Sequence, residues 1–78
     1  MPHVIVKMYP GRSEEQKKNL TEAIAREVVA IVKCPPEAVS VAIEEVAPAD
    51  WPEKVYRPDI LVKQQTLYRN PGYKNPFE

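Results

Sequence analysis

The 78-residue chain carries eleven basic and eleven acidic side chains, so its formal net charge at pH 7 is +0. Because the two signs are interspersed, the sequence lacks the basic patch of a nucleic-acid-binding protein, and a small-molecule or protein partner fits better. The single cysteine, Cys34, excludes an intramolecular disulfide, and the single histidine, His3, argues against a structural zinc site.

Three elements are predicted in the first part of the chain. Residues 4–8 form a β-branched run that ends at a Pro-Gly turn, as expected of a buried strand. Ser13 and Gln16 form a capping box at the start of a helix, in which apolar residues recur every three or four positions until Ile31. Residues 39–46 alternate apolar with small or charged side chains and predict a second strand. This order implies an α/β fold in which two parallel strands are joined through the helix.

The rest of the chain is a proline-punctuated tail. Residues from Pro58 to about Tyr68 predict a short C-terminal helix, with Pro58 in its first turn. Aromatic side chains are expected to pack the tail on the domain or on a neighbouring chain; these are Trp51, Tyr56, Tyr73 and Phe77. We therefore expect one domain, 1–78, with a core at 2–46 and a tail at 47–78.

The small size of this domain has a consequence for its assembly. A chain of this length buries a thin core when it folds alone, and without disulfides or a metal the expected support is self-association. The N-terminus does not resemble a signal peptide, and no stretch approaches the roughly 18 apolar residues of a membrane span, so we expect no membrane partner and a cytoplasmic location.

Pro2 is the first candidate for chemistry. A small second residue of this kind generally permits removal of Met1, which would leave a free secondary amine at the chain terminus. An ordinary terminal amine has a pKa of roughly 7.7–8.0, and an apolar pocket or a nearby cation would disfavour its charged form. Such an amine can act as a general base when neutral and as a general acid when protonated. Because Met-Pro starts occur in many unrelated chains, such a start alone favours a proline that only rigidifies the chain end.

Two longer patterns add to this interpretation. Residues 2–7 (Pro-His-Val-Ile-Val-Lys), residues 11–17 (Gly-Arg-Ser-Glu-Glu-Gln-Lys) and the second strand resemble the 4-oxalocrotonate tautomerase family over residues 2–51. The tail is similar to the extended C-terminus of small bacterial tautomerases related to that family. The resemblance implies a tautomerase-like β-α-β subunit in a homo-oligomer, either a dimer or a hexamer, and the long tail favours the dimer.

The resemblance also implies an activity. It predicts an isomerase that needs no metal or cofactor and interconverts the enol and keto forms, or shifts a double bond, of a small 2-oxo acid-like substrate. Pro2 would be the general base and acid. Within the same superfamily the alternative is a hydratase or dehalogenase, for which Glu44 or Glu45 would have to activate water. An alternative from another class is a non-catalytic oligomeric interaction module.

Three further site residues follow from the resemblance. Arg12 matches the family's arginine that binds a substrate carboxylate and lowers the pKa of the proline, although it could also be a solvated loop residue. Ser40 falls where a second family arginine polarises the substrate oxygen, so that task would have to pass to its hydroxyl, to an ordered water, or to His3, Arg57 or Arg69 from another chain. Trp51 matches an aromatic residue that keeps the site apolar, and it could equally anchor the tail. Cys34 is not expected to act as a nucleophile.

Overall fold

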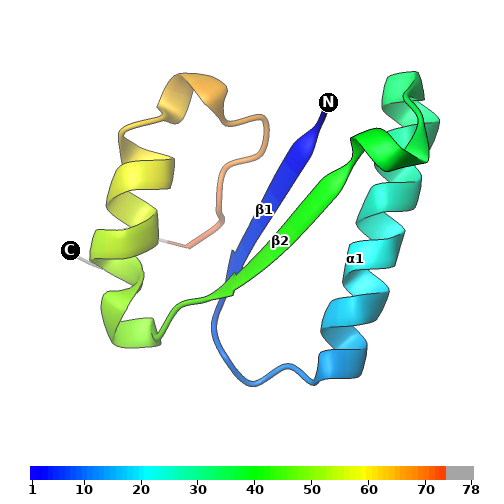
Figure 1. Cartoon of the computed structure of the whole chain (residues 1–78). Helices are drawn as coiled ribbons and strands as arrows, with labels where there is room; N and C mark the ends of the chain where they lie inside the picture. The colour runs from blue at the N-terminus through cyan, green and yellow to red at the C-terminus, as the bar shows by residue number, and fades with distance from the viewer. Residues whose placement is uncertain (74–78) are drawn as a thin grey trace. The chain divides into compact units, whose positions relative to one another are not determined.

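The computed structural model describes residues 1–73, which fall into two compact units, Met1–Glu45 and the segment from Val46 onward. The first unit contains strand β1 (His3–Met8), helix α1 (Glu14–Val28) and strand β2 (Ser40–Glu45). The two strands lie side by side with α1 along them, as Figure 1 shows. The β-α-β core expected from the sequence is therefore confirmed, and each unit is described by itself below.

The strands pair in parallel, in a register that runs from His3 opposite Ser40 to Met8 opposite Glu45. Val41 and Ile43 line a hollow together with residues of α1, so these odd-numbered positions of β2 face the helix. Because side chains alternate along a strand, His3 and Ile5 of β1 share the other face with Ser40 of β2. The sheet thus carries an apolar face toward α1 and a mixed face that contains the His3–Ser40 pair.

Helix α1 begins where the capping box predicts. The Ser13 hydroxyl accepts a hydrogen bond from the Gln16 backbone N–H at 3.0 Å, and the Gln16 side-chain oxygen accepts one from the Ser13 N–H at 2.9 Å. Before the cap, Gly11 has a φ of +124°, a backbone conformation that L side chains rarely adopt. The turn that carries Arg12 is therefore fixed between a required glycine and a capped helix.

Replacing Ser13 with alanine should lower the free energy of unfolding by about 1 kcal/mol, because one helix N–H then loses its acceptor. Urea denaturation at matched protein concentration would measure this loss. Ser13→Asp keeps an acceptor at the cap, so its free energy of unfolding should lie within about 0.5 kcal/mol of that of the parent. An equal loss in both variants would contradict the role of the cap.

The helical segment that starts with α1 ends at Lys33, shortly after Ile31, where the predicted apolar pattern stops. The helix continues as a π-helical turn, η1 (Val29–Lys33), and stops at Lys33, whose φ of 63° is left-handed. A non-glycine residue in that conformation cannot continue a right-handed helix. Two prolines follow, and the second begins a short 3₁₀ turn, η2 (Pro36–Ala38), that leads into β2.

Lys17 joins the start of α1 to the end of β2. Its ammonium lies 2.8 Å from a Glu14 carboxylate oxygen and 3.5 Å from one of Glu45, and its side chain is 16% exposed. The hydrogen bond to Glu14, followed by the attraction of both carboxylates, raises the pKa of Lys17. These ion pairs hold the helix entry against the strand end.

The raised pKa of Lys17 makes its contribution to stability depend on alkaline pH. A lysine whose pKa is higher in the folded chain stabilises the fold fully below its unfolded pKa, and the effect disappears as pH rises through the folded pKa. The melting temperature of Lys17→Met should therefore lie below that of the parent at pH 7–9, and the gap should close above the ordinary value of 10.5. Circular dichroism melts of both chains, with the exposed Lys18→Met as control, test this; a gap that persists at pH 12 would contradict it.

The second unit is helical in short pieces: η3 (Pro48–Asp50), the π-helical η4 (Pro52–Leu61) and η5 (Gln64–Thr66). A helix in the tail is confirmed, but the predicted bounds, Pro58 to about Tyr68, are wrong. Pro52 occupies the first turn, where a missing N–H costs nothing, and Pro58 lies inside the helix. Wide π-type turns are a known way to seat a proline within a helix.

Val55, in η4, is 5% exposed and is the single buried residue among residues 1–73. Phe77, expected to anchor the tail, lies outside the described residues. Every helix in the described chain is too short or too polar to cross a bilayer.

Candidate functional site

Pro2 lies immediately before β1 and is fixed to the start of β2. Its carbonyl oxygen accepts a hydrogen bond from the Ser40 backbone N–H at 3.2 Å. Pro2 itself is partly exposed, whereas Met1 before it is fully exposed. The ring is thus held at the edge of a regular sheet, and its nitrogen is separated from the anchored carbonyl carbon only by Cα.

Ser40 contacts a second candidate residue through its side chain. The Ser40 Oγ lies 2.6 Å from Nδ1 of His3, its register partner on β1. His3 was expected to act, if at all, from another chain, but in the structure it is paired with Ser40 of its own chain. The pair was not predicted, although aligning the starts of the two parallel strands would have indicated it. Pro2, His3 and Ser40 therefore gather at one end of the sheet.

Arg12 lies in the turn between β1 and α1. It lines a hollow of about 190 Å³ with Met8, Gln16, Lys17 and Leu20. The Arg12 guanidinium forms no ion pair with any of residues 1–73, in contrast to Lys17 beside it. An exposed guanidinium that has no carboxylate partner among residues 1–73, next to apolar side chains, suits a ligand that carries both a carboxylate and a hydrocarbon part.

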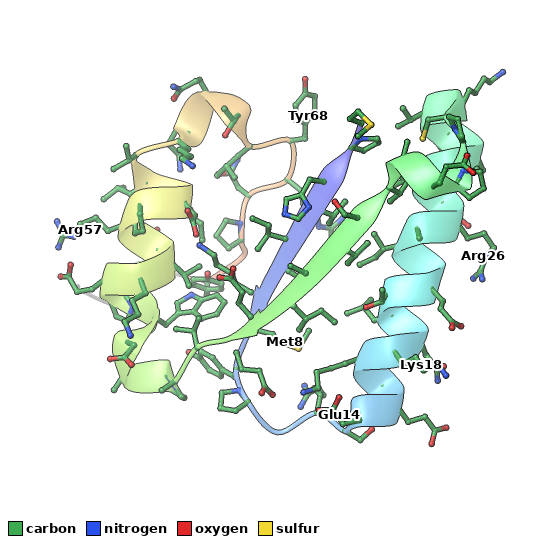
Figure 2. The ribbon with its side chains drawn as sticks, in the orientation of Figure 1. Met8, Glu14, Lys18, Arg26, Arg57 and Tyr68 are labelled. Atoms are coloured by element: carbon green, nitrogen blue, oxygen red, sulfur yellow. The ribbon has the colours of Figure 1, made fainter. Side chains whose placement is uncertain are left out.

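Pro2 and Arg12 of one chain lie at opposite ends of β1. In Figure 1 the N-terminus is at one end of the strand and the turn toward α1 is at the other, and in Figure 2 Met8 and Glu14 mark that turn end. The strand has six residues, which corresponds to a length of about 20 Å. An arginine side chain reaches only about 7 Å. One chain therefore does not bring both residues to one small substrate.

Trp51 belongs to the second unit, between η3 and η4. Its indole N–H donates a hydrogen bond to the Tyr73 hydroxyl at 3.1 Å. The Tyr73 ring in turn lies 5.9 Å from that of Tyr56, tilted by 50°. These contacts all lie within the second unit, so both expected roles of Trp51, as anchor of the tail and as wall of the site, stay predictions.

The remaining candidates have other surroundings. Glu45 is engaged with Lys17, whereas Glu44 points to the other side of β2, so the two carboxylates do not form a pair. Cys34 is a partly exposed free thiol at the end of η1. No group of three His, Cys, Asp or Glu side chains within residues 1–73 is arranged to hold a metal ion.

Comparison with known proteins gives a consistent result. Residues 2–53 match the family model described as tautomerase enzyme. A probable tautomerase of Xylella fastidiosa (strain 9a5c) is 41% identical over 73 residues, which cover 94% of this chain and 89% of the relative. Tautomerase PptA of Cronobacter sakazakii (strain ATCC BAA-894) is 35% identical over 75 residues, covering 95% and 99%.

A solved structure agrees with the sequence relatives. The heterohexamer 4-oxalocrotonate tautomerase from Chloroflexus aurantiacus J-10-fl superposes with a TM-score of 0.63 and is 35% identical, over 65% of this chain and 82% of that one. The family match covers the β-α-β unit in which Pro2, Arg12 and Ser40 lie. The chain therefore belongs to the tautomerase enzyme family, and this membership supports a tautomerase-type activity.

Proposed function

We propose that this protein is an isomerase that interconverts the enol and keto forms, or shifts a double bond, of a small 2-oxo acid-like substrate, with the nitrogen of Pro2 as general base and acid. The observation that carries the proposal is the anchoring of Pro2 at the sheet edge by the 3.2 Å hydrogen bond from Ser40. Once Met1 is removed, a secondary amine would be held there by a rigid element, as proton transfer requires.

The proposed ketonisation step balances without any cofactor. The lone pair of the Pro2 nitrogen accepts the proton of the enol hydroxyl, and the electrons of that O–H bond form the carbonyl. The electrons of the carbon–carbon double bond then take the proton from the prolinium, which returns the amine to its neutral form. A double-bond shift differs only in that the first proton leaves a carbon.

The binding of the substrate requires a second copy of the chain in this proposal. Because Arg12 cannot reach Pro2 of its own chain, the carboxylate anchor would come from a partner, and Trp51 would add an apolar wall. The open edges of the two-stranded sheet and exposed apolar side chains support self-association; among the latter are Ile5 (50%), Ile31 (74%) and Val32 (60%). We propose a homo-oligomer, with a dimer preferred to the hexamer.

Ketonisation of 2-hydroxymuconate and of phenylenolpyruvate by methionine-free protein tests the proposal. The parent chain should remove the enol absorbance of at least one of them faster than buffer does. Cys34→Ser should retain kcat/KM within about 2-fold, since a lone thiol without a paired base has no part in the reaction. Turnover of neither substrate by the correctly folded chain would refute the proposed activity.

A further inference from the structure

Enol–keto chemistry needs more than a base. When a proton leaves carbon next to a carbonyl, negative charge develops on the oxygen, and a hydrogen-bond donor placed there is often the largest source of rate enhancement. The Pro2 nitrogen transfers the proton, but it does not stabilise the negative charge that develops on the substrate oxygen. The following inference rests on the proposed function and concerns the residue that meets this oxygen.

The His3–Ser40 pair is the side-chain hydrogen bond that adjoins Pro2. Ser40 touches Pro2 through its backbone N–H at 3.2 Å and touches His3 through its Oγ at 2.6 Å. Both His3 and Ser40 are exposed and share the sheet face that does not meet α1. A substrate held at the Pro2 nitrogen would therefore lie within reach of a hydroxyl whose position is set by two strands.

The position of the imidazole proton of His3 determines whether the Ser40 hydroxyl can donate a hydrogen bond to a substrate. A serine hydroxyl has one proton and can also accept hydrogen bonds, and a neutral imidazole carries its proton on one of its two nitrogens. If His3 Nδ1 carries the proton and donates it to Ser40 Oγ, the serine proton remains available for a substrate oxygen. With the proton on Nε2 instead, Ser40 donates to His3 and has none left to give.

We propose that the Ser40 hydroxyl is a catalytic residue that donates a hydrogen bond to the developing oxyanion, and that His3 is a positioning residue that occupies the Ser40 lone pair through Nδ1–H. The pair thereby supplies electrophilic assistance from a neutral donor.

Variants of Ser40 test the donor. Ser40→Ala should lower kcat about 10- to 100-fold, because one oxyanion donor is lost, and it should leave KM within about 3-fold of the parent since ground-state binding is kept. Ser40→Thr keeps the hydroxyl and should remain within about 5-fold of the parent. Circular dichroism and the melting temperature establish whether each variant is folded. If Ser40→Ala does not fold, the activity of Ser40→Thr still tests the proposal.

Variants of His3 test the positioning. His3→Asn keeps an N–H donor near the place of Nδ1 and should lose less activity than His3→Leu, which we expect to lower kcat about 10-fold. In the double variant His3→Leu/Ser40→Ala, kcat should be no lower than in Ser40→Ala alone, because His3 acts only through Ser40. A merely structural role of His3 would instead multiply the two losses.

The outcomes separate this inference from the proposed function. If the parent shows Pro2-dependent turnover while Ser40→Ala keeps its kcat within 2-fold, or while the two losses multiply, the role of the pair is refuted and the tautomerase proposal stands. If turnover of the parent does not depend on Pro2, the proposed function itself fails. Loss in Ser40→Ala, recovery in Ser40→Thr and non-additivity with His3→Leu together establish the pair.

Discussion

Replacing Pro2 with alanine lowers kcat/KM for enol substrates by about 100-fold or more. Alanine also permits removal of Met1, so the variant still presents a terminal amine at the same place. That amine is primary and rotates about the Cα bond, whereas the pyrrolidine ring fixes the direction of the nitrogen lone pair. The expected loss therefore reports on orientation and basicity of the ring nitrogen, while the anchoring carbonyl of residue 2 is kept.

Stopped-flow or steady-state ketonisation of 2-hydroxymuconate measures this loss, with intact mass confirming that both proteins lack Met1. Cys34→Ser serves as the control, because Cys34 is a free thiol that has no part in the proposed mechanism. Equal activity of Pro2→Ala and the parent would refute general base catalysis by the ring nitrogen.

Replacing Arg12 with alanine raises KM for substrates that carry a carboxylate by about 10- to 100-fold, since a charge-assisted, two-point contact is lost. Arg12→Lys keeps the charge but not the planar fork, and it should recover only part of the affinity. An enol substrate without a carboxylate provides the control and should be converted with a KM close to that of the parent. A uniform loss on both substrates would contradict an anion-binding role.

The position of Pro2 and Arg12 at opposite ends of β1, a strand about 20 Å long, gives a sharper form of this second prediction. If each site combines Pro2 of one chain with Arg12 of another, unfolding and refolding a mixture of Pro2→Ala and Arg12→Ala should restore activity that neither variant has alone. In a two-fold symmetric dimer, about a quarter of the sites would then regain both residues. A mixture no more active than its components would contradict a site that combines Pro2 of one chain with Arg12 of another.

The elements of the first unit could be predicted because their signals are local. The Ser13–Gln16 capping box is made within one helical turn, and each strand has its own continuous sequence pattern, at residues 4–8 and 39–46. The parallel pairing followed from the order strand, helix, strand. In the tail, Pro52 lies in the first turn of η4 and Pro58 lies inside it. The sequence around Pro58 carries no signal for π-helical turns, so a proline at a helix start could not be distinguished from one within a helix.

The site was predictable by residue type more than by arrangement. The chain end points to Pro2 and the family resemblance points to Arg12, and the roles of both residues stay predictions. The His3–Ser40 contact joins residues 37 positions apart and depends on strand register, and the Trp51–Tyr73 bond spans 22 positions. Contacts between residues so far apart in the sequence can be recognised only once the fold is known. The same holds for the separation of Arg12 from Pro2.

The most direct test of the central claim compares the same chain with Met1 removed and with Met1 retained, prepared with and without inhibition of methionine aminopeptidase and quantified by intact mass. In the retained form the Pro2 nitrogen is an amide without a basic lone pair, although every side chain is unchanged. We predict that ketonisation of 2-hydroxymuconate is proportional to the fraction of methionine-free chain and absent from the retained form. Equal turnover by the two forms would contradict catalysis by the Pro2 amine.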